Sequence, residues 1–298
     1  MSRPTVLALG EILWDLLPSG KQLGGAPANF AFHAGQLGAD AVTVSAVGDD
    51  ADGREILERL RALGLRTDLI AVDPHHPTGT VTVALDAAGV PSYTIHEGVA
   101  WDFVPETPAL LELVARADCV CFGSLAQRSP ATRATIRSAL AATRPGCLRV
   151  FDINLRQHYF DRDVIEESLG RTTVLKLNDQ ELPVLGELLG MGGEDLIGDL
   201  VGAFGLRLVA VTRGGRGAVL YSADGAVIEH PGYPAEPLAD TVGAGDAFTA
   251  ALAMGLLRGV PLARITDAAC RVASYVCTRA GATPGFPAEL VNAVGDRK

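Results

Sequence analysis

The sequence predicts a single α/β domain with a mainly parallel sheet, and three observations lead to this fold class. Short β-branched runs alternate with longer helical patterns along the 298 residues. Hydrophobic residues make up 48% of the chain and charged residues only 20%, which is enough apolar material for a large core. Near residue 85 the alternation is interrupted, because two strand-like runs there are separated only by a turn.

The elements follow from these patterns in chain order. Short apolar runs predict strands over residues 5–9, 42–47, 118–122, 148–152, 174–177, 208–212 and 218–221. Longer periodic runs with capping residues or glycines at their ends predict helices over residues 26–37, 52–63, 130–142, 179–190, 195–204, 244–257 and 262–279. We find no internal repeat, low-complexity tract or interdomain linker, so residues 1–298 are expected to form one domain.

The interruption predicts an antiparallel hairpin. The strand-like runs 80–85 and 92–95 flank the turn Asp86-Ala87-Ala88-Gly89. A hairpin inserted between parallel units has two interpretations. It covers a cleft as a lid, or it extends the edge of the main sheet, and the sequence favours neither.

Charge, cysteine and histidine patterns exclude several classes of function. A net charge of −10 with no run of Lys or Arg argues against a nucleic-acid partner. The five cysteines include no Cys-x-x-Cys and the six histidines are scattered, which argues against a disulfide frame or a zinc site. There is no signal-peptide pattern and no apolar stretch of the roughly 20 residues that a membrane span needs, so we expect a cytoplasmic protein without a membrane partner.

The run Asp240-Thr241-Val242-Gly243-Ala244-Gly245-Asp246 precedes a helical pattern that is apolar almost all the way round. Such a helix is buried, so its first turn lies inside the protein. Small residues there allow backbone N–H groups to converge on an anion, and the helix dipole adds partial positive charge. Asp246 could then take a proton from a substrate hydroxyl, as in a kinase that acts on an alcohol. The alternative is an ordinary helix start after a glycine turn.

A second constellation lies near the N-terminus. The strand 5–9 ends before Asp15, and Gly24-Gly25 and Asn29 follow shortly after. Ligands of open parallel sheets bind beyond the carboxyl ends of the strands, and the glycines permit close backbone approach. A carboxylate that accepts hydrogen bonds and an amide that both donates and accepts suit vicinal hydroxyls, which suggests a sugar or polyol site. A turn with capping residues is the alternative.

These two segments, in this order, resemble the two signatures of the ribokinase-like carbohydrate kinase family. The resemblance continues through the residues between them, and it covers essentially the whole chain: Gly48-Asp49-Asp50-Ala51-Asp52-Gly53, Asp152-Ile153-Asn154-Leu155-Arg156, Asn178-Asp179-Gln180-Glu181 and Thr212-Arg213-Gly214-Gly215-Arg216-Gly217. It implies a doubly wound α/β/α sandwich with a small β-sheet lid. The lid would be formed by inserted segments at roughly 11–24 and 78–103.

The resemblance also implies roles for the matching positions. Asp246 corresponds to the catalytic base, and Gly243-Ala244-Gly245 to an anion hole that stabilises the transferred phosphoryl group. Arg156 is a candidate for clamping a phosphate, with a surface ion pair as the alternative. The positions that match the sugar site are Asp15, Gly24, Gly25 and Asn29.

The nucleotide side is inferred in the same way. Asn178 and Glu181 match an Asn-x-x-Glu motif that organises hydrated Mg²⁺ and the nucleotide phosphates, which is compatible with Asn178 as a helix N-cap. The residues that resemble a nucleotide-lining loop are Thr212, Gly214 and Gly217, which also suit a glycine-rich turn.

The implied cofactors are ATP and Mg²⁺, with Glu181 contacting the metal through water. Asp240 matches a position associated with a monovalent cation such as K⁺. Val242 and the run Ala280-Gly281-Ala282 supply no side-chain oxygen, so only backbone carbonyls would complete that site. If the lid exposes an apolar face, pairing with a second copy would bury it, and the resemblance therefore implies a homodimer.

Two absent motifs narrow the mechanism. There is no Gly-x-x-x-x-Gly-Lys-Ser/Thr loop, so phosphate binding does not follow the P-loop plan. There is also no Gly-x-Gly-x-x-Gly after the first strand, which weakens a nucleotide-dependent dehydrogenase, the alternative from another class. A non-catalytic sugar-sensing protein is a further alternative, and Asp246 counts against it.

The spacing of the N-terminal motif bears on the sugar. Only eight residues separate Asp15 from Gly24, and this pattern is most similar to the fructokinase branch, whose members phosphorylate the 6-hydroxyl of fructose. Kinases of 2-keto-3-deoxygluconate share much of it and are the alternative. Trp101, Gln127 and Arg128 are candidates for shaping the sugar pocket, with a core tryptophan and surface polar residues as the alternative.

Overall fold

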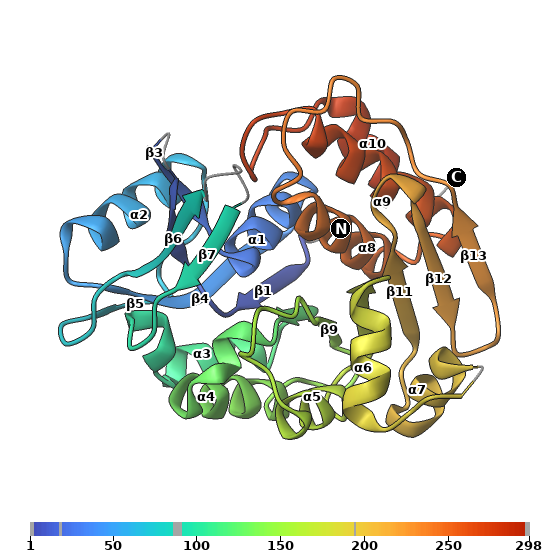
Figure 1. The fold of residues 1–298 in the computed structure, drawn as a ribbon, viewed down its shortest axis with the longest axis horizontal. Helices are drawn as coiled ribbons and strands as arrows, with labels where there is room; N and C mark the ends of the chain where they lie inside the picture. The colour runs from blue at the N-terminus through green and yellow to red at the C-terminus, as the bar shows by residue number, and fades with distance from the viewer. Residues whose placement is uncertain (1–2, 18–19, 86–90, 194, 296–298) are drawn as a thin grey trace.

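The computed structural model describes residues 3–17, 20–85, 91–193 and 195–295, which form two β-sheets and two layers of helices (Figure 1). The larger sheet has nine strands in the order β13-β12-β11-β10-β9-β8-β1-β4-β5. All neighbouring pairs from β11 to β5 are parallel, and β12 and β13 continue the sheet antiparallel at one edge. These strands are β1 (Thr5–Leu9), β4 (Asp40–Gly48), β5 (Ile70–Asp73), β8 (Cys119–Phe122), β9 (Leu148–Asp152), β10 (Val174–Asn178), β11 (Leu208–Thr212), β12 (Ala218–Ser222) and β13 (Val227–His230).

The sheet order reverses at β1. From β1 the chain adds β4 and β5 on one side and later β8 to β13 on the other. In a doubly wound sheet such a switch point opens a crevice at the carboxyl ends of the strands. The fold therefore places a ligand site beyond the ends of β1 and β8.

Helices cover both faces of this sheet, as the predicted sandwich requires. Along β1, Val6 and Ala8 belong to one hydrophobic core while Leu7 and Leu9 belong to the other, because successive side chains point to opposite faces. The first core is covered by α1 (Ala26–Gln36), α2 (Ala51–Ala62), α8 (Ala244–Leu257), α9 (Leu262–Cys277) and α10 (Ala288–Gly295). The second is covered by α3 (Pro108–Val114), α4 (Pro130–Ala141), α5 (Arg162–Leu169), α6 (Glu181–Leu189) and α7 (Leu196–Phe204), which line the lower side of Figure 1.

A second sheet of four strands stands apart from the first. Its order is β3-β2-β6-β7, with β2 (Leu13–Leu17), β3 (Gly20–Gly24), β6 (Gly79–Leu85) and β7 (Pro91–Ile95). The strands β6 and β7 pair antiparallel, as the hairpin pattern predicted, and the predicted turn 86–89 lies outside the described residues. The hairpin does not extend the main sheet, so that alternative is wrong.

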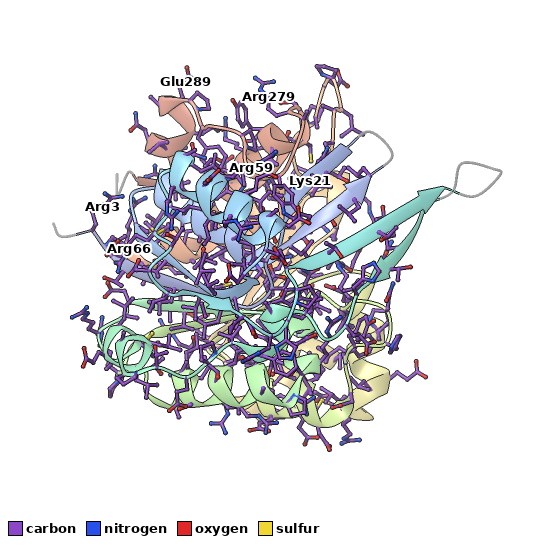
Figure 2. The ribbon with its side chains drawn as sticks, turned by 90° about the vertical axis from the view of Figure 1, so that its left-hand side faces the viewer. Arg3, Lys21, Arg59, Arg66, Arg279 and Glu289 are labelled. Atoms are coloured by element: carbon purple, nitrogen blue, oxygen red, sulfur yellow. The ribbon has the colours of Figure 1, made fainter. Side chains whose placement is uncertain are left out.

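One end of this second sheet is anchored on α2. Trp14 of β2 is fully buried, and its indole N–H donates to the carbonyl of Asp52 over 3.1 Å. Lys21 of β3 and Arg59 of α2 both lie over the Trp14 ring, and Figure 2 shows their side chains close together. Lys21 also pairs with Asp52 at 2.6 Å, so apolar, cation–π and ionic contacts all join the sheet to the helix.

Every strand and helix predicted from the sequence is present, and several short elements were missed. The strands β2 and β3 lie in the segment 11–24, which was expected in the lid without separate strand bounds. The missed ones are β5, β13, α3, α5 and α10, together with the short 3₁₀ turns η1 (Ala100–Phe103), η2 (Leu125–Arg128) and η3 (Gly214–Arg216). The missed helices α3, α5 and α10 have only seven or eight residues, so the helical period repeats too few times in them to stand out. Within the described ranges, none of the helices has the length and apolar character needed to span a bilayer.

Candidate active site

A small cavity lies at the switch point of the main sheet. It is bounded by the carboxyl ends of β1, β8 and β9 and by the first turns of α1 and α8, and its volume of about 20 Å³ has room for about one water molecule. The lining combines apolar residues with several polar side chains. It is made by Glu11, Ala26, Pro27, Phe30, Cys121, Phe122, Gly123, Ser124, Leu125, Asp152, Asn154 and Asp246.

Asp246 and Asn29 meet in this region although they lie 217 residues apart in the sequence. The side-chain N–H of Asn29 donates to Oδ2 of Asp246 over 2.9 Å. Burial, and then the neighbouring charge of Asp152, raise the pKa of Asp246 to about 6, while Asn29, Lys176 and Arg156 oppose that rise. A carboxylate with this pKa is ionised at neutral pH and is basic enough to accept a proton from a bound hydroxyl.

Gly243 begins α8 with a backbone that other residues would not tolerate. Its φ is +79°, and a side-chain carbon there would lie 2.5 Å from the carbonyl oxygen of Ala282. Glycine therefore lets the 280–282 loop pack directly on the start of the helix. The N–H groups of the first turn have no partners within the helix, and together with the helix dipole they suit an anion.

A buried ion pair lies beside this turn, and the sequence analysis missed its lysine. Lys176 of β10 bonds Asp152 at 3.0 Å, and the hydroxyl of Thr249 donates to the other oxygen of Asp152 over 2.7 Å. Burial lowers the pKa of Lys176, but Asp152, Glu181 and Asp246 outweigh it and leave the pKa raised, so the lysine stays charged. A side-chain carbon on Gly245 would be 3.2 Å from Nζ of Lys176, which places a fixed cation next to the anion site.

Glu11 is a third buried carboxyl that lines the cavity, beside Asp246 and Asp152. Burial raises the pKa of Glu11 to about 7, the charge of Asp246 adds to the rise, and backbone hydrogen bonds and Arg156 oppose it. The cavity thus holds two carboxyls that titrate near neutral pH. Such perturbed pairs are typical of functional sites.

The positions that match a sugar site lie on one side of Asp246. A side-chain carbon on Gly24 would be 2.4 Å from Oδ2 of Asp15, and one on Gly25 would be 2.5 Å from the carbonyl oxygen of Glu11. The two glycines therefore let the β3–α1 turn close against Asp15 and Glu11. Burial raises the pKa of Asp15, and the charge of the exposed Arg156 opposes this rise. These contacts link Gly24 to Asp15, and Gly25 to Glu11, which lines the same cavity as Asp246.

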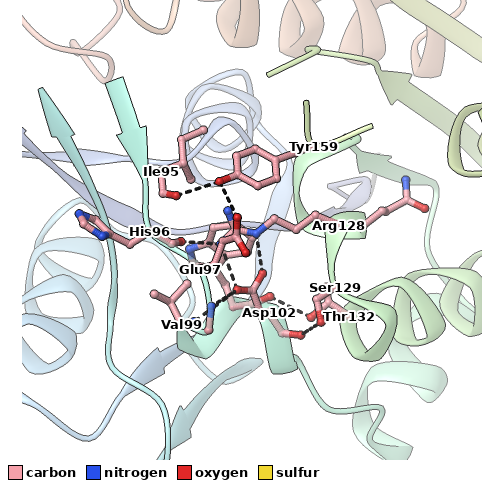
Figure 3. Close-up of polar contacts among 12 residues, drawn as sticks. Ile95, His96, Glu97, Val99, Asp102, Arg128, Ser129, Thr132 and Tyr159 are labelled. Carbon is pink, nitrogen blue, oxygen red and sulfur yellow. Dashed lines mark hydrogen bonds and ion pairs between the residues drawn. The ribbon is translucent and has the colours of Figure 1, made fainter. Parts of the chain in front are cut away.

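Three other candidates for the sugar pocket do not line the cavity. Trp101 is fully buried in the second core, so the core alternative is correct for it. The side-chain amide of Gln127 is buried and donates to Gly123 and Ser168. Arg128 pairs with Asp102 at 2.8 Å and lines a separate polar hollow of about 440 Å³ (Figure 3). Nothing in the local sequence separates these environments, because partners distant in the chain create them.

Asn178 and Glu181 form a reciprocal cap at the start of α6. The side chain of Asn178 accepts from the N–H of Glu181 over 2.9 Å, and Glu181 accepts from the N–H of Asn178 over 2.8 Å. The other oxygen of Glu181 accepts from the N–H of Leu155 at 2.8 Å. Over the described part of the chain, no three His, Cys, Asp or Glu side chains gather into a metal site.

The glycine-rich loop after β11 stands next to this cap. Thr212 is the register partner of Asn178, which brings the loop to the same edge of the sheet. Gly217 has φ +79°, and a side-chain carbon there would be 2.0 Å from the carbonyl oxygen of His230. Gly214 is exposed with φ +57°. The loop therefore presents the backbone of Gly214 and the exposed side chain of Arg216, which pairs with Asp179, to solvent.

Asp240 holds the turn that leads into α8. Its two carboxylate oxygens accept from the N–H of Val242 at 3.0 Å and the N–H of Gly281 at 3.3 Å. These bonds connect the 240–242 turn to the 280–282 loop, which packs on Gly243.

Residues 19–289 match the model of the pfkB family carbohydrate kinases. The chain belongs to this family. This kinase is 31% identical to a fructokinase of Klebsiella pneumoniae, with 86% of each chain covered, and 31% identical to a ribokinase of Bacillus subtilis, with 89% of this chain and 84% of the relative covered.

A solved structure agrees with the fold of this kinase. An uncharacterized sugar kinase of Pyrococcus horikoshii in complex with ATP superposes with a TM-score of 0.81 at 28% identity, covering 97% of this chain and 99% of the other. The predicted family and sandwich fold are thus confirmed, and a dehydrogenase is excluded. A fructokinase and a ribokinase are equally similar to this kinase, so the identities do not choose the sugar.

Proposed function

We propose that this carbohydrate kinase transfers the γ-phosphoryl group of ATP to the primary hydroxyl of a sugar, with fructose as acceptor and fructose 6-phosphate as product. The observation that carries the proposal is the contact of Asn29 with Asp246 at the first turn of α8, beside the cavity. A polar amide that suits a sugar hydroxyl and a carboxylate that suits its proton are there in direct contact. The fructokinase relative and the ATP complex of the Pyrococcus horikoshii kinase support the choice of substrates.

In this mechanism Asp246 accepts the proton of the attacking hydroxyl. The N–H groups of Gly243-Ala244-Gly245 stabilise charge on the transferred phosphoryl group, and Lys176 adds positive charge beside Gly245. The enclosed cavity has room for about one water molecule, so the sugar ring would lie at its mouth, against Asp15, Asn29 and Arg156. Closing the second sheet over that mouth would exclude water.

Magnesium bound to the nucleotide would neutralise phosphate charge during transfer. Both oxygens of Glu181 already accept backbone N–H bonds, which fits a contact to Mg²⁺ through water better than direct ligation. Asn178, Thr212, Gly214 and Gly217 would line the nucleotide. A K⁺ ion near Asp240 would need backbone carbonyls for most of its ligands, because the carboxylate oxygens already accept the N–H groups of Val242 and Gly281.

A kinase of 2-keto-3-deoxygluconate is the second candidate, and one observation favours it. A substrate carboxylate needs a cation, and Arg156 is exposed close enough to the site to affect the pKa values of Glu11, Asp15 and Asp246. Arg128 is not suited to that role, since its side chain is already paired with Asp102.

The test is ATP consumption by the purified protein with Mg²⁺ and four acceptors: fructose, ribose, 2-keto-3-deoxygluconate and adenosine. Turnover on fructose alone is expected. Preference for the keto-acid would replace fructose with the second candidate, and Arg156→Ala should then abolish the preference. Preference for ribose or adenosine, or no turnover at all, would contradict both candidates.

Assembly and location complete the proposal. We propose a homodimer that buries the exposed face of the second sheet, where Tyr93 is 54% exposed, and gel filtration that returns only monomer would contradict it. A cytoplasmic location is supported by the five cysteines, all of which are free thiols. Fractionation of the producing cells would check it.

A further inference from the structure

The six residues 154–159, which we call the β9 loop, contact both the Asp246 cavity and the nucleotide side. Asn154 lines the cavity. The next residue, Leu155, donates its N–H to Glu181 over 2.8 Å. The charge of Arg156 opposes the rise that burial causes in the pKa of Asp15, on the proposed sugar side. One short segment thus lies between the two sites that the proposed reaction requires.

The β9 loop is also bonded to the free edge of the second sheet. The amide of Gln157 donates to the carbonyl of Tyr93 over 2.6 Å. The hydroxyl of Tyr159 is shared between the carbonyl of Ile95 at 3.1 Å and the carboxylate of Glu97 at 2.9 Å (Figure 3). The strand β7 is the outermost strand of its sheet, and the backbone N–H of His96 donates to the carbonyl of Thr80, so the alternate positions 93 and 95 turn their backbone groups away from β6. Gln157 and Tyr159 therefore occupy the place of the next strand.

Arg128 fixes Tyr159 in this position. Its guanidinium lies 4.0 Å from the centre of the Trp101 ring and 4.8 Å from that of Tyr159. Arg128 also donates to the carbonyl of His96 at 2.6 Å and to the carboxylate of Asp102 (Figure 3). The end of β7 is thus bonded to the body of the protein through two adjacent side chains.

The backbone of the β9 loop is strained at two positions. Asn154 has φ +42° and Gln157 has φ +48°, and within the described ranges these are the two non-glycine residues with positive φ. Strain of this kind persists only where surrounding contacts hold it. The bonds from Leu155 to Glu181 and from Gln157 to Tyr93 flank the strained positions and supply such contacts.

We propose that Gln157 and Tyr159 are positioning residues that couple closure of the second sheet over the acceptor to nucleotide binding beside Glu181. Movement of β7 toward the cavity carries the β9 loop with it and changes the contact of Leu155 with Glu181. The coupling is reciprocal, so the acceptor strengthens nucleotide binding and the nucleotide strengthens acceptor binding by the same factor. The inference rests on the proposed function, because it needs both ligands.

The test measures the affinity of the full-length protein for Mg²⁺ with the non-hydrolysable analogue AMP-PNP by calorimetry, with and without saturating fructose. The wild type should bind the analogue more tightly with fructose, by a factor on the order of 5 to 150. In the double variant Gln157→Ala/Tyr159→Phe this factor should fall to about one, while the affinity without fructose stays within about threefold. A variant that keeps the wild-type factor overturns the proposal.

The matched control is Tyr275→Phe, which also removes a hydrogen bond from a tyrosine hydroxyl to a backbone carbonyl, here that of Gly285. It should keep the wild-type factor. Thermal melting of each variant shows whether the fold is intact, and the single variant Tyr159→Phe, which loses only a hydroxyl, serves if the double variant unfolds.

A second readout separates this proposal from the identity of the sugar. Hydrogen exchange of residues 91–96 with the AMP-PNP complex alone should slow in the wild type and remain fast in the double variant. Equal slowing in both overturns the coupling even if fructose is the acceptor. Failure of fructose to bind contradicts the proposed acceptor only, and failure of the wild type to bind AMP-PNP contradicts the proposed function itself.

Discussion

Two regions meet at the first turn of α8, and they are built differently. On the proposed sugar side, Asn29 and Glu11 are buried side chains, and Asn29 already bonds Asp246. On the proposed nucleotide side, the loops are open to solvent: Gly214 is exposed, and Val242 is 49% exposed.

The difference indicates where each region obtains its selectivity. Fixed side chains around a sugar reject an acceptor that leaves one of their polar groups unpaired. Backbone N–H groups bind any phosphate chain that reaches them. We therefore expect the sugar side to choose the substrate and the nucleotide side to be more tolerant.

The largest expected effect comes from the group that both regions share. Asp246→Asn removes the base but keeps an oxygen that can accept from Asn29, so turnover should fall by about 10²- to 10⁴-fold with sugar affinity nearly unchanged. Steady-state rates and direct sugar binding check this. Asp267→Asn on α9 is a control for the loss of a carboxylate, and a fully active Asp246→Asn would refute the assigned role.

The pH dependence follows from the same group. Because the pKa of Asp246 is raised to about 6, turnover should be constant above that pH and fall as the pH drops through it, when the base becomes protonated. Initial rates over a range of about pH 5 to 8 would show this limb. A profile that is flat through pH 6 would mean that another group accepts the proton.

Lys176→Met tests the buried cation that lies between the two regions. It leaves Asp152 unpaired in the interior, which should cost about 3–5 kcal/mol of stability. Since Lys176 lowers the pKa of Asp246, its loss should also move the acidic limb of the rate profile to higher pH. Lys176→Met/Asp152→Asn, which removes both charges, should recover part of the stability measured by denaturant unfolding.

A matched pair of glycine variants sharpens the comparison. Gly25 and Gly243 both have positive φ, and at each a side-chain carbon would lie 2.5 Å from a backbone carbonyl oxygen. Gly25→Ala should raise the KM for the sugar and Gly243→Ala the KM for ATP, each by about tenfold, because a local shift of about an ångström misplaces one ligand. Equal effects on both KM values in either variant would contradict the division into two regions.

Arg156→Ala should have the smallest effect if fructose is the acceptor. The side chain is exposed, and a sugar without charge loses only a hydrogen bond, so the KM for fructose should rise by about three- to tenfold. Arg156→Lys keeps the charge and serves as the control. A loss of more than about a hundredfold with the keto-acid would identify a carboxylate partner instead.

The sequence by itself determined the alternation of strands and helices and the two ends of the site. Repeating local patterns encode the strands of the main sheet, and the apolar run 247–255 encodes a helix buried on all sides. Asn29 and Asp246 were found because each follows a glycine-rich turn with its own local signature. Such local signals can be recognised in the sequence without knowing which distant residues they contact in the fold.

The tertiary structure decided what depends on contacts between distant segments. It buried Trp101 in the core and paired Arg128 with Asp102. It also placed Lys176 beside Gly245, although the sequence shows this lysine only as one charge within an apolar strand. Burial and pairing belong to the folded neighbourhood of a side chain and not to its own residue type. The physical reason is that desolvation and ion pairing act through space, so only the assembled fold determines which charges meet.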